Sequence, residues 1–174
     1  PIATDWKATD WLMANCYLQE QILNNSSRPI EDARIHAMLC YRTPESFEVK
    51  FNRTINDELG VFNIESWLAH HGEKLQQRFQ LASYKLMNQL LKTIDITRGR
   101  GSFESVVAPI TANIHIIGIN TDLFFTPIEN RKTYLELQQL QHQVSYQEID
   151  SIHGHDAFLI EFEQLHRLLA TVFE

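Results

Sequence analysis

Two polar residues, each placed after a predicted strand, could form an acid–base pair. Asp122 follows an apolar run that is rich in β-branched residues, and His155 lies in a Gly-His-Asp sequence after a second predicted strand. A carboxylate that accepts a hydrogen bond from an imidazole orients the ring and stabilises its protonated form, so the histidine can act as a general base. An acid at such a position often serves only as a helix cap, and position alone does not decide between the two roles.

The elements between these residues predict how the two side chains could meet. Residues 112–119 predict a strand, Pro127 begins a predicted helix, and residues 144–149 predict a second strand. A strand, a helix and a strand of this size predict a right-handed β-α-β unit with parallel strands. Because the carboxyl ends of parallel strands lie at one edge of the sheet, where open α/β sheets bind ligands, we expect both polar loops at that edge.

The sequence before this unit predicts helices alone. Apolar residues recur at helical spacing after Asp10, after Pro29, after Thr43-Pro44, after Asn63 and around Met87. A glycine-containing joint at residues 97–102 then separates two regions, a helical one over residues 1–100 and an α/β segment over residues 101–174. The α/β segment ends in a predicted helix that begins near Phe158, and residues 1–4 have the pattern of a strand end.

Two predicted strands are too few for the kind of sheet they imply. A pair of parallel strands is not stable alone, and parallel sheets are covered by helices on both faces. We therefore expect further strands from sequence before Pro1, from another chain or from a second copy.

Composition limits the classes of function. The chain has 174 residues, 44% of them hydrophobic, and a formal net charge of -7, with no basic run, so we expect no nucleic-acid partner. No apolar run has the length of a membrane span, and we expect a cytoplasmic protein. Cys16 and Cys40 are too few and too distant in sequence to suggest a disulfide framework or a zinc site, so we expect buried, reduced thiols.

Two further groups of residues have chemical potential. His153, His155 and Asp156 could suggest a metal site, but no further ligands follow them and we expect no metal. Arg34 and Tyr41 are seven residues apart on a predicted helix and therefore share a face, where an arginine can bind a carboxylate. Packing of the arginine on the tyrosine ring is the simpler interpretation of that pair.

A catalytic nucleophile is missing from the pattern. No Gly-x-Ser-x-Gly sequence occurs, and the Gly101-Ser102 pair has no glycine two residues later. An acid followed by a histidine matches the second and third members of the order Ser, Asp, His that α/β-hydrolases use.

Several stretches through nearly the whole chain resemble one family in the family's order. They are residues 33–35 and 39–47, residues 65–68, 72–74 and 78–79, residues 119–127, and residues 148–151 and 154–159. Together they resemble the lid and C-terminal half of homoserine O-acetyltransferases, acyltransferases of the α/β-hydrolase fold. The last two stretches keep the acid and the histidine at the family's separation.

The resemblance implies an activity and a set of roles. It implies a Ser-His-Asp acyltransferase that moves acetyl from acetyl-CoA, its co-substrate, to the hydroxyl of L-homoserine in methionine biosynthesis, through an acyl-serine and with no bound cofactor. Asp122 then resembles the triad acid and His155 the base, while Arg34, Tyr41 and Asp156 resemble the homoserine-binding groups.

The resemblance also implies an assembly. The helical region resembles a lid that commonly forms a homodimer, and the absent N-terminal half would carry the serine, so we expect the chain alone to be inactive. Two alternatives stay open: a sibling α/β-hydrolase such as an O-succinyltransferase or esterase, and a non-catalytic helical dimerisation fragment.

Overall fold

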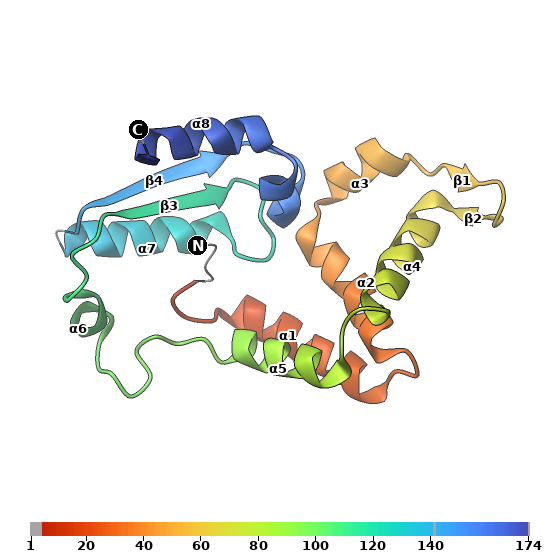
Figure 1. The fold of residues 1–174 in the computed structure, drawn as a ribbon, viewed down its shortest axis with the longest axis horizontal. Coiled ribbons are helices and arrows are strands. Elements are labelled where there is room, and N and C mark those ends of the chain that lie inside the picture. The colour runs from red at the N-terminus through yellow and green to blue at the C-terminus, as the bar shows by residue number, and fades with distance from the viewer. Residues whose placement is uncertain (1–4, 141, 174) are drawn as a thin grey trace. The chain divides into compact units, whose positions relative to one another are not determined.

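The chain divides into two compact units. The computed structural model describes residues 5–140 and 142–173. Of the described residues, one unit contains residues 8–93, and the other contains residues 94–140 and 142–173 together with residues 5–7 (Figure 1). The strand end expected at residues 1–4 lies outside the described residues.

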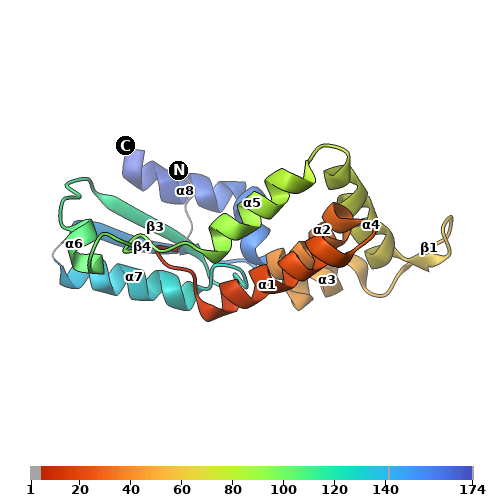
Figure 2. The ribbon, with the colours of Figure 1, turned by 90° about the horizontal axis from the view of Figure 1, so that it is seen from below.

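The unit of residues 8–93 is helical, as the sequence pattern predicts. Its elements are α1 (Asp10–Asn25), α2 (Pro29–Tyr41), α3 (Pro44–Phe51), β1 (Ile55–Asn56), β2 (Val61–Phe62), α4 (Asn63–Gln76) and α5 (Leu81–Lys92). Helix α3 begins as expected, because the Thr43 hydroxyl accepts the Ser46 N–H at 3.0 Å. Helices α1 and α5 lie side by side (Figures 1 and 2), where Asn88 donates to the Cys16 carbonyl at 2.9 Å.

Two local details of this unit differ from the sequence prediction of helices alone and of a helix cap at Asn63. Strands β1 and β2 form a short antiparallel hairpin around the loop predicted at residues 56–60, with Ile55 opposite Phe62. Asn63 is the first helical residue of α4 rather than its cap. The cap position belongs to Phe62, whose N–H donates to the Glu65 carboxylate at 2.8 Å, so an acid in the first turn replaces the expected asparagine.

The core of the helical unit is formed largely by α1 and α2. Its buried side chains include Leu12, Cys16, Leu23, Ile30, Ala33, Ala37 and Met38. Helix α4 approaches α2 closely at Gly72, since a Cβ atom there would lie 2.6 Å from Cγ of Glu31. A glycine at this position therefore permits the contact between the two helices.

The second unit contains the predicted β-α-β arrangement. Its elements are α6 (Phe103–Val107), β3 (Ile114–Ile119), α7 (Pro127–Gln139), β4 (Val144–Ile149), the 3₁₀ helix η1 (Gly154–Leu159) and α8 (Phe162–Phe173). Strands β3 and β4 pair in parallel, from Ile114 opposite Val144 to Ile119 opposite Ile149. Helices α7 and α8 lie on opposite sides of this pair (Figure 1).

The end of the chain differs from the single helix predicted from Phe158. The 3₁₀ helix ends where the N–H groups of Ile160 and Glu161 both donate to the Ala157 carbonyl, at 2.9 and 2.7 Å. Helix α8 then starts separately at Phe162. His155 therefore lies in the 3₁₀ helix rather than before a long α-helix.

The carboxyl ends of the two strands lie in the core of this unit. Ile119, Ile149 and Ala157 are buried together, and Ile117, Phe158, Leu165 and Leu168 pack against them. Both loops that follow the strands therefore start from a fixed, buried point.

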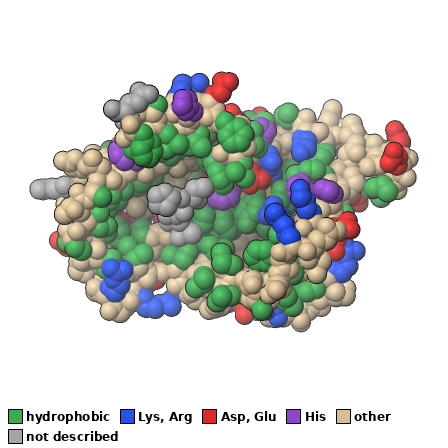
Figure 3. Space-filling model, in the orientation of Figure 1, with side chains coloured by type: hydrophobic (Ala, Val, Ile, Leu, Met, Phe, Trp, Pro, Cys, Tyr) green, Lys and Arg blue, Asp and Glu red, His purple; other side chains and the backbone are tan. Residues whose placement is uncertain are grey.

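Large hydrophobic side chains are also exposed on the described surface. Figure 3 shows hydrophobic side chains at the surface over both units. In the helical unit they include Trp11, Tyr17 and Leu18 of α1 and Leu86, Met87 and Leu90 of α5. Within the described residues, no helix combines the length and apolar character that a membrane span requires.

Candidate functional site

Asp122 and His155 meet at the carboxyl edge of the two parallel strands. The Nδ1 atom of His155 lies 2.8 Å from Oδ2 of Asp122, and their side chains are only 18% and 5% exposed. When Asp122 is ionised, this hydrogen bond places the imidazole proton on Nδ1. The Nε2 atom is then left with the lone pair that a general base needs.

Asp122 is held by the loop that it begins. Its Oδ1 atom accepts the N–H groups of Phe124 at 2.7 Å and of Phe125 at 3.0 Å. The N–H of Asp122 donates to the Ile119 carbonyl at 3.1 Å. One carboxylate oxygen is therefore fixed by the backbone, which directs the other at the imidazole. Asp122 is therefore not the cap of the next helix, because α7 has Thr126 at its N-cap position and Oδ1 binds the loop before it.

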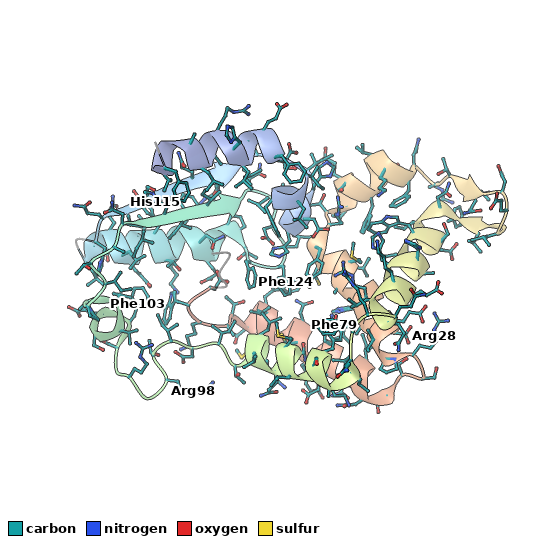
Figure 4. The ribbon with its side chains drawn as sticks, in the orientation of Figure 1. Arg28, Phe79, Arg98, Phe103, His115 and Phe124 are labelled. Carbon is teal, nitrogen blue, oxygen red and sulfur yellow. The ribbon has the colours of Figure 1, made fainter. Side chains whose placement is uncertain are left out.

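Aromatic rings surround the imidazole. The ring centroids of Phe124, Phe125 and Phe158 lie 5.2, 5.3 and 5.8 Å from that of His155, all in steep, edge-on geometry. Figure 4 shows Phe124 in the loop after β3 and His115 near the other end of that strand. These rings restrict the orientation of the imidazole and the access of water to it.

Side chains that the sequence pattern did not identify join the acid loop, which follows β3 and carries Asp122, to the histidine loop, which follows β4 and carries His155. Asn120 accepts the Ser151 N–H at 3.0 Å through its Oδ1 atom. The Thr121 hydroxyl donates to the Ser151 carbonyl at 2.6 Å and accepts the Gly154 N–H at 3.2 Å. Their position directly after β3 was the available signal, because polar residues at neighbouring strand ends lie within reach of one another.

The three predicted substrate-binding residues occupy two places. Asp156 follows His155 in the 3₁₀ helix and is partly exposed. Arg34 and Tyr41 lie together on α2, where the guanidinium carbon is 5.4 Å from the centroid of the tyrosine ring. This is the packed arrangement that the sequence allowed as the simpler interpretation, and it leaves the role in substrate binding as a prediction.

Other reactive groups do not assemble into a second centre. Among residues 5–140 and 142–173, no three His, Cys, Asp or Glu side chains come close enough to bind a metal ion. Cys16 and Cys40 are both buried and free. Burial raises the pKa of the Cys16 thiol to about 11, which disfavours the reactive thiolate.

Comparison with known proteins gives many relatives with one name. No protein-family model matches the chain. A homoserine O-acetyltransferase of Chlorobium chlorochromatii is 35% identical over 155 residues, which are 88% of this chain and 42% of that protein. A homoserine O-acetyltransferase of Cyclobacterium marinum is 32% identical over 183 residues, 99% of this chain and 51% of that protein. The chain thus spans about half the length of the curated relatives it matches.

Solved structures share the fold at lower identity. The homoserine O-acetyltransferase of Bacillus anthracis has a TM-score of 0.74 at 18% identity and covers 88% of this chain and 47% of its own. An esterase has a TM-score of 0.75 at 13% identity, over 94% of this chain and 51% of its own. The same fold is therefore found in a protein named as a transferase and in one named as a hydrolase.

Proposed function

Because the chain is related to homoserine O-acetyltransferases over about half their length and has part of an α/β-hydrolase fold, we propose that it carries the acid and base of a Ser-His-Asp acyltransferase. The observation that carries the proposal is the 2.8 Å contact between His155 Nδ1 and Asp122 Oδ2. The reaction proposed is transfer of acetyl from acetyl-CoA to the hydroxyl of L-homoserine, in methionine biosynthesis.

The pair would serve both halves of a ping-pong reaction. In the first half, Nε2 of His155 takes the proton of a serine hydroxyl as the serine oxygen attacks the thioester carbonyl, and then gives that proton to the departing CoA sulfur. In the second half, Nε2 takes the proton of the homoserine hydroxyl as it attacks the acetyl-serine, and returns it to the serine oxygen. Asp122 stabilises the imidazolium formed in each half.

The predicted substrate-binding residues have the charges that homoserine requires. Arg34 would bind the carboxylate, for which the guanidinium offers two parallel N–H donors, and its stacking on Tyr41 restricts the orientation of that group. Asp156 would bind the ammonium group beside the base, since it is the next residue after His155.

The serine and the donors that stabilise the oxyanion would come from the remaining half of the fold, which this chain's relatives carry. The chain alone is then inactive. The exposed apolar residues on α1 and α5 support a second part of the proposal, in which the helical unit is a lid that forms a homodimer.

The test is acetyl transfer measured on the chain alone and after the remaining half is supplied. The complete protein should transfer acetyl from acetyl-CoA to homoserine, and His155→Ala should lower kcat by roughly 1000-fold or more. His115→Ala is the matched control, because this exposed histidine also makes a side-chain hydrogen bond, to Ser145 at 2.7 Å, near the other end of β3. Turnover by the chain alone, or equal effects of the two variants, would reject the proposal.

Ester hydrolysis is the second candidate, and the similarity of the fold to an esterase favours it over other chemistry. Both candidates use the same pair and differ in the acyl acceptor. Comparison of acetyl-CoA, succinyl-CoA and simple acetyl esters, each with and without homoserine, separates transfer, succinyl transfer and hydrolysis. Acetyl-CoA consumption that does not depend on homoserine would favour the hydrolase.

A further inference from the structure

The hydroxyl of Thr121 bridges the backbone segments that carry the acid and the base. It donates to the carbonyl of Ser151 at 2.6 Å and accepts the N–H of Gly154 at 3.2 Å. Thr121 directly precedes Asp122, and Gly154 directly precedes His155. One side-chain oxygen therefore joins the residues next to both members of the pair.

The histidine loop needs such a brace because of its backbone. Gly154 is buried and has a φ of +66°, a left-handed conformation in which glycine avoids the steric cost of a side chain. Its N–H must find an acceptor, since an unpaired buried N–H costs free energy. The Thr121 hydroxyl supplies that acceptor and binds the other end of the same turn at Ser151.

The hydrogen bond of Asn120 reaches a different part of the histidine loop. Asn120 reaches the Ser151 N–H at 3.0 Å, which fixes the start of the histidine loop. Thr121 is the residue that extends the connection to Gly154, three residues further along the loop. Loss of its hydroxyl would leave the contact at the start of the loop in place and remove the hydrogen bond to Gly154, the residue before His155.

We propose that Thr121 is a positioning residue that sets the contact between Asp122 Oδ2 and His155 Nδ1 by joining the two loops. The inference rests on the proposed function, in which this pair is the acid and base, and it adds a residue to which no catalytic role is otherwise given. Misplacement of a catalytic group by about 1 Å can cost roughly 100-fold in rate. Loss of the Thr121 hydrogen bonds should therefore lower kcat more than it changes the KM for homoserine.

Three variants separate positioning from stability. Thr121→Val keeps the shape and removes the hydroxyl, whereas Thr121→Ser keeps the hydroxyl and removes the methyl group. Thr133→Val is the matched control, because the Thr133 hydroxyl donates to the Glu129 carbonyl at 3.0 Å within α7 of the same unit. Any general effect of losing a threonine hydroxyl in this unit appears in the control.

Two measurements test the proposal. The first is the NMR signal of the His155 Nδ1 proton and the second is kcat and KM for acetyl transfer, both measured on the complete protein after the remaining half is supplied. We expect Thr121→Val to weaken or remove the proton signal and to lower kcat by roughly 10- to 100-fold. Thr121→Ser should restore both, and Thr133→Val should match the original protein in both.

The outcomes distinguish this inference from the proposed function. A Thr121→Val variant that keeps the proton signal and the kcat of Thr133→Val would overturn the positioning role, and so would a serine variant as impaired as the valine variant. If the complete protein showed the proton signal but transferred no acetyl group, the proposed function would fail. The comparison of proton signals between Thr121→Val and Thr133→Val would still decide the role of Thr121.

Discussion

Replacement of Asp122 by asparagine should inactivate the site by reversing the tautomer of His155. The structure determines how the new amide must sit. Oδ1 of Asp122 accepts two backbone N–H groups, at 2.7 and 3.0 Å, so an amide nitrogen at that position would face two donors. The asparagine oxygen should therefore keep the place of Oδ1, and its NH₂ group should take the place of Oδ2, 2.8 Å from Nδ1 of His155.

The energies favour this orientation. The opposite orientation removes the acceptor of two partly buried N–H groups, at up to about 1–3 kcal/mol each, whereas the expected one requires only that the imidazole proton move from Nδ1 to Nε2. That move leaves no lone pair on Nε2 to accept a proton. An acid-to-amide change of this kind in a Ser-His-Asp triad costs about 10⁴-fold in kcat, or about 5.5 kcal/mol, and we expect a loss of the same order.

The assay combines acetyl transfer by the complete protein with nitrogen NMR of the labelled imidazole, which identifies the tautomer directly. Asp95→Asn is the matched control, since Oδ1 of Asp95 accepts the N–H of Thr97, two residues later, at 2.9 Å in the same unit. It should leave kcat unchanged. An Asp122→Asn protein that keeps more than a tenth of kcat, or that keeps the proton on Nδ1, would refute the reasoning.

Three further predictions concern the helical unit. Gly72→Ala should lower the free energy of unfolding of this unit by about 1 kcal/mol in chemical denaturation. The new Cβ would lie 3.0 Å from the Glu31 carbonyl oxygen, and the cost of this overpacking should exceed the gain in helix propensity. A rise in the free energy of unfolding would contradict this. Burial lowers the pKa of His36 below its ordinary value of 6.5. The neutral, buried imidazole therefore contributes its full stability at pH values above 6.5, and this stability is lost as the pH falls from 6.5 toward the lowered pKa. His36→Leu should therefore flatten the fall in unfolding free energy between pH 7 and 5, and an unchanged slope would count against it. Arg34→Lys in the complete protein should raise the KM for homoserine by about 10-fold or more and spare acylation by acetyl-CoA, whereas equal damage to both half-reactions would exclude a carboxylate-binding role.

Strong periodicity explains which parts of the fold the sequence could predict. Helix α2 begins at Pro29 as expected. Of its predicted apolar stripe, Ile30, Ala33, Ala37 and Met38 are buried and Tyr41 is half-buried. Strand β3 was predicted from a short apolar run and β4 from the segment after the next helix, and their parallel pairing follows from the helix between them. The closeness of the loops after these strands follows from that pairing, which is why the neighbourhood of Asp122 and His155 could be inferred without coordinates.

Short elements and long-range polar contacts could not be predicted from the pattern of apolar residues in the sequence. Helix α6 and the β1–β2 hairpin are shorter than the windows in which a period can be recognised. The break between η1 and α8 depends on the backbone hydrogen bonds of Ile160 and Glu161, which no side-chain period records. The hydroxyl of Thr121 reaches residues thirty and thirty-three positions away, so its partners could not be named before the register of the strands was known.

The register of the two strands explains why the acid and base can be fixed within one segment. Ile119 is paired with Ile149 in a buried position, so the chain leaves both strands at the same level. Each of the next three residues after Ile119 then contacts the second loop: Asn120 at Ser151, Thr121 at Ser151 and Gly154, and Asp122 at His155. A shift of one residue in the register would turn the side chains of β3 to the other face and displace the loop that carries Asp122, so all of these contacts would be lost together. The acid–base geometry is thus a property of the β3–β4 pairing, while the serine and the acyl donor must be brought to Nε2 by the rest of the proposed enzyme.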